Sequence, residues 1–268
     1  MKARILPLLC LGLSLAAADA WNWAPVIQVG IEHVVPGEEA PHQKNEHAWA
    51  LAMARARSPY PFLGMTAVAG GSEAWWIWPL KGFKDLDGLR EFPEKDPGLK
   101  ARVAAIAAKD GHFIDDLGIT VYVLRSDLSH GPGTVLPRYY WVFNLQGRPG
   151  HDGDFEDFCK QLNAAYDKAG IQPHWCVYQM VAGANAPSWL VMTPLHALGD
   201  LEALFAEDAK FAGAVGPDVL KSLNRLEADG LGEEHTLLMA VDPLMSYPDK
   251  AEEAADPEFW KGWDKADK

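Results

Sequence analysis

The segment PLKGFKDLDGL, residues 79–89, recurs in pattern as PLHALGDLEAL at residues 194–204. Working outward from this pair, residues 26–70 align without a gap on residues 139–183. The longer block needs a shift of 113 residues, and the shorter one, which follows a two-residue insertion, a shift of 115. A period this long indicates two copies of one domain and not a solenoid of short repeats.

Both copies have the same periodicity along the chain. VIQVGIEHV (26–34) alternates like a strand, and RYYWVFNLQ (138–146) is its aromatic counterpart. A Pro-Gly break and a helix follow in each copy, at 41–57 and 154–169. The remaining predicted elements are hairpins at 62–80 and 174–195, short helices at 82–92 and 197–207, helical stretches at 98–111 and 217–230, and last strands at 119–126 and 235–242.

This order predicts an α+β protein made of two tandem ferredoxin-like βαββαβ repeats, each an antiparallel sheet with helices on one face. Strands such as YYWVF (139–143) and AWWIW (74–78) are apolar on both faces, so the face without helices must also be buried. Two such sheets in one chain can cover each other. We therefore expect one pseudo-dimeric α+β barrel that does not require an oligomer.

The segment WWIWPLKGFKDLDGLREFPEKDPGLKA, residues 75–101, carries a resemblance to a known group. A Trp-rich strand, a proline, a short amphipathic helix and a second helix opened by Asp-Pro resemble the dimeric α+β-barrel superfamily. Within it, the pattern is similar to the NIPSNAP-like and antibiotic-biosynthesis-monooxygenase-like branches. The resemblance implies the fold more than a chemistry, since members range from cofactor-free oxygenases and haem enzymes to proteins with no known activity.

The first 20 residues have the pattern of a signal peptide. Lys2 and Arg4 precede the apolar run ILPLLCLGLSLAA, and Ala-Asp-Ala at 18–20 is a small-x-small cleavage pattern, so a mature chain would begin at Trp21. No later stretch approaches the roughly 20 apolar residues of a membrane span. We expect a secreted or periplasmic protein with no membrane contact after cleavage. The predicted parts are a signal peptide (1–20), a first repeat (21–130), a second repeat (131–250) and an acidic Trp-containing tail (251–268).

Charge and cysteine content narrow the class further. The formal net charge of −13 disfavours nucleic acid and anionic lipid as partners. Cys159 and Cys176 remain after the signal segment. In an oxidising compartment they could form a disulfide, worth up to roughly 3 kcal/mol for a loop of this length, or they could be buried free thiols.

The repeat provides an internal control for the first helix. In the second copy its buried stripe is apolar, and the ungapped alignment makes the N-terminal half of the same stripe polar in the first copy. The second-copy stripe is Phe155, Phe158, Cys159, Leu162, Ala165, Tyr166 and Ala169, and the first-copy stripe is His42, Asn45, Glu46, Trp49, Ala52, Met53 and Ala56. Unpaired polar groups facing a sheet cost roughly 1 to 3 kcal/mol each, so water, a ligand or one another should compensate them.

These residues predict a ligand site in the cleft between sheet and helices of the first repeat. His42 near a helix N-terminus is the candidate catalytic base, with Glu46 four residues on to assist it. The candidate ligand-binding residues are His33, Asn45, Trp49, Trp76 and Trp78. We expect a small hydrophobic molecule, bound and in one reading oxidised, without a built-in cofactor.

Three alternatives stay open at this stage. Residues 41–47 could be an exposed first turn with no function. A metal ion could bind His33, His42 and Glu46, which are chemically suitable ligands, although no H-E-x-x-H motif is present. The whole protein could be a non-catalytic binding or structural interaction protein, or, as a third possibility, a haem- or metal-binding enzyme.

Overall fold

The computed structural model describes residues 23–131 and 137–265, so the predicted signal peptide at 1–20 lies outside it. Within these residues no helix has the length and apolar character that crossing a membrane requires. The strands are β1 Val26–Val34, β2 Leu63–Ala69, β3 Glu73–Leu80, β4 Ile114–Leu124, β5 Tyr139–Gly147, β6 Cys176–Ala182, β7 Ser188–Leu195 and β8 Leu231–Val241. The helices are α1 Glu39–Arg55, α2 Lys84–Glu91, α3 Pro97–Asp110, α4 Asp152–Ala169, α5 Asp200–Val215, α6 Pro217–Gly230, α7 Lys250–Ala255 and a 3₁₀ turn at Pro93–Lys95.

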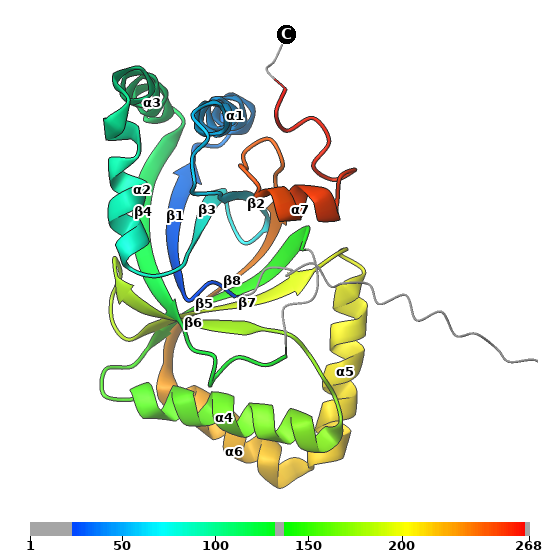
Figure 1. The fold of residues 1–268 in the computed structure, drawn as a ribbon. Helices are drawn as coiled ribbons and strands as arrows, with labels where there is room; N and C mark the ends of the chain where they lie inside the picture. The colour runs from blue at the N-terminus through cyan, green and yellow to red at the C-terminus, as the bar shows by residue number, and fades with distance from the viewer. Residues whose placement is uncertain (1–22, 132–136, 266–268) are drawn as a thin grey trace, which may run out of the picture.

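The eight described strands form one closed antiparallel barrel in the order β1-β3-β2-β8-β5-β7-β6-β4 (Figure 1). Strands of the first half, β4-β1-β3-β2, and of the second, β8-β5-β7-β6, each form a continuous arc of this barrel. The arcs join at two seams, β2 with β8 and β6 with β4. The predicted α+β class with a closed barrel is therefore confirmed.

Side chains from all eight strands fill the barrel interior. Ile27 and Val29 of β1, for example, lie in one buried cluster with Tyr140 and Val142 of β5. Trp260, which follows α7, belongs to the same cluster and is 5% exposed. Trp263 lies in this cluster as well, so both tryptophans pack the C-terminal segment onto the barrel.

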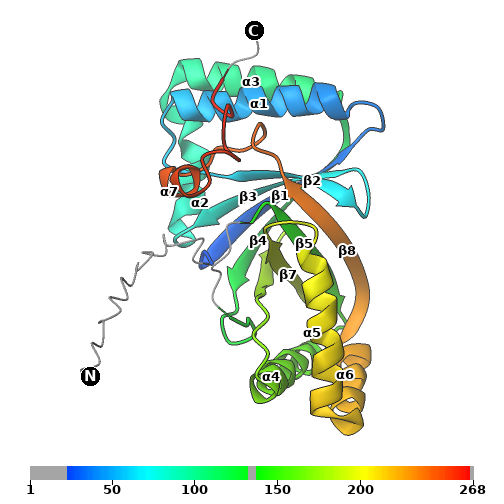
Figure 2. The same cartoon turned by 90° about the vertical axis from the view of Figure 1, so that its right-hand side faces the viewer.

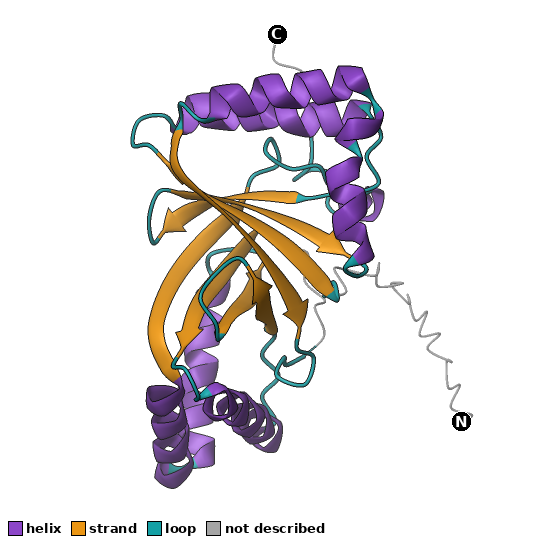
Figure 3. Ribbon diagram, turned by 90° about the vertical axis from the view of Figure 1, so that its left-hand side faces the viewer, coloured by secondary structure: helices purple, strands orange, loops and turns teal. Residues whose placement is uncertain are grey.

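Helices cover the outside of the barrel in two separate groups (Figure 3). In the first half α1 and α3 pack side by side on the outer sheet face, and their cluster includes Ala50, Leu99 and Trp76. In the second half α4 lies against α6, with Phe155 and Leu223 in the clusters beneath (Figure 2). Because the inner face of each sheet is used by the barrel core, the space between sheet and helices is where clefts form.

Element boundaries depart from the predicted ones mainly at strand ends. β4 and β8 begin at Ile114 and Leu231, several residues before the predicted starts at 119 and 235. After these apolar first residues come exposed acidic pairs, at 115–116 and 233–234, so no alternation of hydrophobicity marks the strand starts, yet they pair with β1 and β5. α5 runs over 16 residues, whereas its counterpart α2 has eight.

Both seams contain a bulge at the same place in the aligned sequence. The pairing of β2 with β8 skips Val68, and that of β6 with β4 skips Val181, and both side chains are about half exposed. Gly70 and Gly183 follow, with φ of +111° and +108°. A Cβ at Gly183 would lie 2.2 Å from the backbone oxygen of Ile119 on the neighbouring strand. Glycine is therefore required there by both conformation and space.

Cys159 and Cys176, for which the sequence allowed either a disulfide or free thiols, are free thiols in the structure, and both are buried. Cys159 is on the buried face of α4, whereas Cys176 faces the barrel interior, and the two belong to different clusters. Burial raises the pKa of the Cys159 thiol to about 12. The disulfide alternative is not realised in this structure.

Gly183→Ala is expected to lower the free energy of unfolding by more than about 2 kcal/mol, since it combines a positive φ with a backbone clash at the seam. Gly213→Ala, in α5 with open space around the position, is the control and should be neutral or stabilise by up to about 1 kcal/mol. Denaturant unfolding of both variants measures this. Equal stabilities would show that the seam accommodates a side chain.

Candidate functional site

The polar residues at the start of α1 are buried. His42 is 2% exposed, and Asn45 and Glu46 are each 7% exposed. Pro41 lies in the first turn, where its missing N–H is not needed, so the helix is already regular at His42. The interpretation of 41–47 as an exposed turn is therefore wrong.

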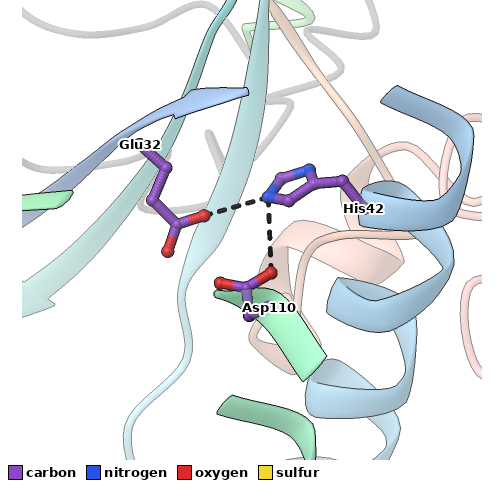
Figure 4. Close-up of side chains that lie close together, drawn as sticks. All are labelled: Glu32, His42 and Asp110. Carbon is purple, nitrogen blue, oxygen red and sulfur yellow. Dashed lines mark hydrogen bonds and ion pairs between the residues drawn. The ribbon is translucent and has the colours of Figure 1, made fainter. Parts of the chain in front are cut away.

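Two carboxylates converge on one nitrogen of His42 (Figure 4). Glu32 Oε2 of β1 lies 2.9 Å from His42 Nε2, and Asp110 Oδ1, from the last residue of α3, lies 3.8 Å from it. The first distance is a hydrogen bond, and the second is too long for one. Three elements far apart in the chain thus bring their functional groups to one point.

Glu46 and Asn45 extend this cluster. Asn45 Nδ2 donates to the backbone oxygen of Ile106 at 3.2 Å and to Asp110 Oδ1 at 3.3 Å. Burial raises the pKa of Glu46 well above its usual value, and the nearby charges of Asp110 and Glu32 raise it further. Burial also raises the pKa of Glu32, against the lowering effect of its hydrogen bond to His42. Glu46 and Glu32 therefore hold their protons to higher pH than exposed carboxyl groups do.

A cavity of about 370 Å³ opens beside the cluster, between the outer face of the sheet and α1 and α3. Its polar end is formed by Glu32, Glu46 and Asp110. The remaining lining is largely apolar and consists of Gly30, Trp49, Trp76, Trp78, Ile106, Ala107, Gly111, Ile114, Leu117 and Ile119. Leu117 and Ile119 are about half exposed, so the mouth of the cavity is apolar as well.

Most of the candidate residues predicted from sequence gather here. Glu46, Trp49, Trp76 and Trp78 line the cavity. His42 does not line it but lies behind Glu32, with its ring edge-on to Trp76 at 5.7 Å. Asn45 likewise lies behind the wall and bonds to Asp110. These two residues therefore act through the carboxylates that face the cavity.

His33 is not part of the cluster, which corrects the prediction that it lies beside His42. It is half exposed and points to the opposite face of β1, where its imidazole is 3.8 Å from Glu73. Adjacent strand residues alternate between faces, so Glu32 occupies the helix-covered side instead. Alternation along residues 26–34 already indicates that Glu32 and His33 lie on opposite faces of the strand. Neither Glu32 nor Asp110 was predicted as a site residue.

The second half offers an apolar counterpart of this cluster. The alignment that sets His42 on Phe155 and Glu46 on Cys159 also sets Glu32 on Leu145. Leu145, Phe155 and Cys159 pack together in one buried cluster. The same position in the fold is thus filled by hydrophobic side chains in one half and by ionisable ones in the other.

The donor set determines which groups the site could hold. Among the residues that the structure describes, Glu32, His42 and Asp110 form one group whose ligand atoms all lie within 4.8 Å of one another. This set replaces the hypothesised His33, His42 and Glu46, since His33 lies elsewhere.

The acidic residues of both described clefts disfavour haem, although His174 also lines the second one. The second cleft has a volume of about 260 Å³ and presents Asp208, Glu227 and Glu234. Its described lining contains no Lys or Arg, and neither does that of the first cleft. Haem propionates are anionic and would be repelled by these carboxylates. The residues present therefore argue against the haem alternative.

No protein-family model matches the chain, and no curated protein is significantly similar to it. Solved structures share its fold. An anthrone oxidase-like protein has a TM-score of 0.52 and 10% identity, over 84% of this chain and 94% of that one. A variant of chlorite dismutase from Candidatus Nitrospira defluvii has a TM-score of 0.49 and 10% identity, over 89% of this chain and 98% of that one. The chain thus shares its fold with this anthrone oxidase-like protein.

Replacing Glu32, His42 and Glu46 together by Leu, Phe and Cys, the second-half residues, is expected to be neutral or to stabilise the protein by about 1 to 4 kcal/mol, since buried ionisable groups give way to hydrophobic packing. His42→Phe alone should destabilise by about 3 to 5 kcal/mol, because it leaves Glu32 buried without its partner. Denaturant unfolding distinguishes the two. A destabilised triple variant would mean that the cluster contributes to folding rather than to a site.

Glu46→Gln is expected to stabilise the protein increasingly as pH rises. The pKa of Glu46 is raised in the folded state, so its favourable contribution is complete below the unfolded pKa of about 4.5 and is lost as pH rises through the folded pKa. Gln resembles the protonated form and keeps its contribution at all pH values. Unfolding free energies at pH 5 and pH 8, with EDTA present, measure the difference, and Glu91→Gln at an exposed carboxylate controls for the loss of one charge. An effect independent of pH would contradict this account.

Proposed function

We propose that the protein binds a small, largely apolar molecule carrying a hydroxyl or carbonyl group in the cleft of its first half, and that the carboxyl cluster exchanges a proton with it. One observation supports this above others: a cavity with tryptophan walls ends at three buried carboxyl groups. Binding pockets typically combine apolar walls with a few convergent polar groups.

The walls fit a flat aromatic molecule. A volume of about 370 Å³ lies in the range of small-molecule sites. Trp49, Trp76 and Trp78 present large apolar surfaces, and such surfaces stack on or pack edge-on to a bound ring. Trp76 is 3% exposed and its indole N–H is buried without a hydrogen-bond partner. A ligand oxygen in the cavity is a suitable acceptor for this N–H.

The chemistry follows from which groups touch the cavity. Glu32 faces it and is held by His42, so Glu32 is the candidate proton acceptor and His42 the positioning residue. Glu46, whose pKa is raised by burial, is the candidate proton donor. This assignment differs from the sequence-based prediction, in which His42 is the base and Glu46 assists it, because Glu32 and not His42 lines the cavity. If the deprotonated molecule is then oxidised, O₂ would be the electron acceptor. The alternative function is binding of the molecule without catalysis.

We also infer that the two halves are tandem ferredoxin-like repeats that arose by duplication, 21–130 and 131–250. The aligned residues support this, because Val29 pairs with Ile77 and Val142 with Met192, at the shifts of 113 and 115 residues. Membership of the NIPSNAP-like or antibiotic-biosynthesis-monooxygenase-like branches, and export to a secreted or periplasmic location, belong to the same proposal. The signal-peptide pattern at 1–20 supports export.

The proposed binding is tested with 1-naphthol as probe, followed by quenching of tryptophan fluorescence. Ala107→Phe places a ring in the cavity without changing the carboxyl cluster and should weaken binding at least tenfold. Ala108→Phe, the next residue of α3, is the matched control, because Ala108 does not line the cavity and is exposed. Equal affinities in the two variants, or no saturable binding to the unmodified protein, would refute the proposal.

A further inference from the structure

Two carboxylates approach His42 Nε2, and this nitrogen is within hydrogen-bond distance of only one of them. A single ring nitrogen serves Glu32 Oε2 at 2.9 Å, and Asp110 Oδ1 at 3.8 Å gains no hydrogen bond from it. The three side chains are 2%, 10% and 11% exposed, so water reaches them poorly. Two carboxylates this close to one nitrogen, and shielded from solvent, form a concentrated negative site.

The described lining of the cavity supplies no compensating charge. It includes Glu32, Glu46 and Asp110 but no Lys or Arg. A divalent cation relieves the repulsion between these carboxylates, because it interacts with two of them at once.

The geometry suits such an ion. One imidazole nitrogen and two carboxylate oxygens lie within 4.8 Å of one another. Metal–ligand bonds of about 2.0 to 2.2 Å place neighbouring ligand atoms about 3 to 4 Å apart, so small side-chain rotations suffice. The groups come from β1, α1 and α3, whose packing fixes their spacing.

Two further features are typical of a metal centre open to a substrate. Asn45 Nδ2 donates to Asp110 Oδ1 and orients this carboxylate from behind. Among the described residues the metal-ligating side chains number three here, and two of them, Glu32 and Asp110, line the cavity, so further coordination positions are open to a molecule bound there. The unpartnered indole N–H of Trp76 is an independent sign that this cavity accepts a polar atom.

We propose that Glu32, His42 and Asp110 bind one divalent transition-metal ion, such as Mn²⁺, Fe²⁺ or Zn²⁺, at the polar end of the first cleft. Mixed imidazole and carboxylate ligands suit these ions. This proposal rests on the proposed function, because the metal ion would lie at the polar end of the cavity that binds the small apolar molecule. With the ion in place Glu32 is a ligand, and Glu46 is the carboxyl group left to exchange a proton with that molecule.

The test uses the full chain, freed of metal by EDTA and dialysis, and titrates it with Mn²⁺ while the electron paramagnetic resonance signal of free Mn²⁺ is recorded. We expect one ion per chain, with affinity lowered at least tenfold in Glu32→Gln and in Asp110→Asn. The ion should raise the melting temperature of the unmodified protein but not that of these variants. Both substitutions preserve side-chain shape, and circular dichroism verifies that they fold.

The matched control is the double variant His33→Ala and His235→Ala, which removes the exposed imidazoles beside Glu73. It should bind Mn²⁺ as the unmodified protein does. Absence of one-to-one binding, unchanged affinity in Glu32→Gln and Asp110→Asn, or loss of binding in the double variant would each overturn the proposal.

Failure of the metal site and failure of the proposed function give different results. Binding of 1-naphthol in EDTA without any Mn²⁺ binding would remove the metal site and leave the function. Mn²⁺ binding at Glu32 and Asp110 without naphthol binding at any metal level would support the metal site, and the class of molecule proposed for the cavity would be wrong.

Discussion

The burial of both sheets' inner faces in one barrel interior is the constraint on which the rest of the structure depends. The interior cluster takes side chains from every strand of the barrel. Full burial of each large apolar side chain contributes about 1.5 to 3 kcal/mol. A backbone hydrogen bond across a seam contributes a net of only about 0.5 to 1.5 kcal/mol, and each seam has four paired positions. Packing of the interior, more than strand pairing, therefore holds the two halves together.

This use of the inner face leaves the outer face, beneath the helices, for binding. The second half closes its outer face with Leu145, Phe155 and Cys159. The first half keeps the same space polar at one end and hollow beside it. The barrel makes the polar end of this cavity rigid, because β1 belongs to both. Val29 of β1 packs in the barrel interior, and Glu32 on the other face of β1 lines the cavity.

Sequence reasoning could identify the barrel and the polar stripe of α1, because both depend on local periodicity compared between two copies. It could not place Asp110, since a lone acidic residue at a helix end is usually solvated and only the packing of α3 on α1 brings it to His42. The error at His33 has a different cause. Histidine is a common base and metal ligand, which favours His33 as a site residue. Alternation along β1 nevertheless places Glu32, and not His33, on the face covered by α1.

The C-terminal segment, which has no counterpart in the alignment of the two halves, helps to hold α1 and its polar residues in place. His47, next to Glu46 in α1, lies with Nε2 2.8 Å from the backbone oxygen of Trp263. Trp263 is itself part of the barrel-core cluster, so the C-terminal segment links α1 to the interior, and Figures 1 and 2 show this segment running beside α1. Arg138 binds Asp256 and holds the same segment from the second half. The first-half cleft thus depends on contacts from both halves, because the segment that contacts α1 is itself held by Arg138.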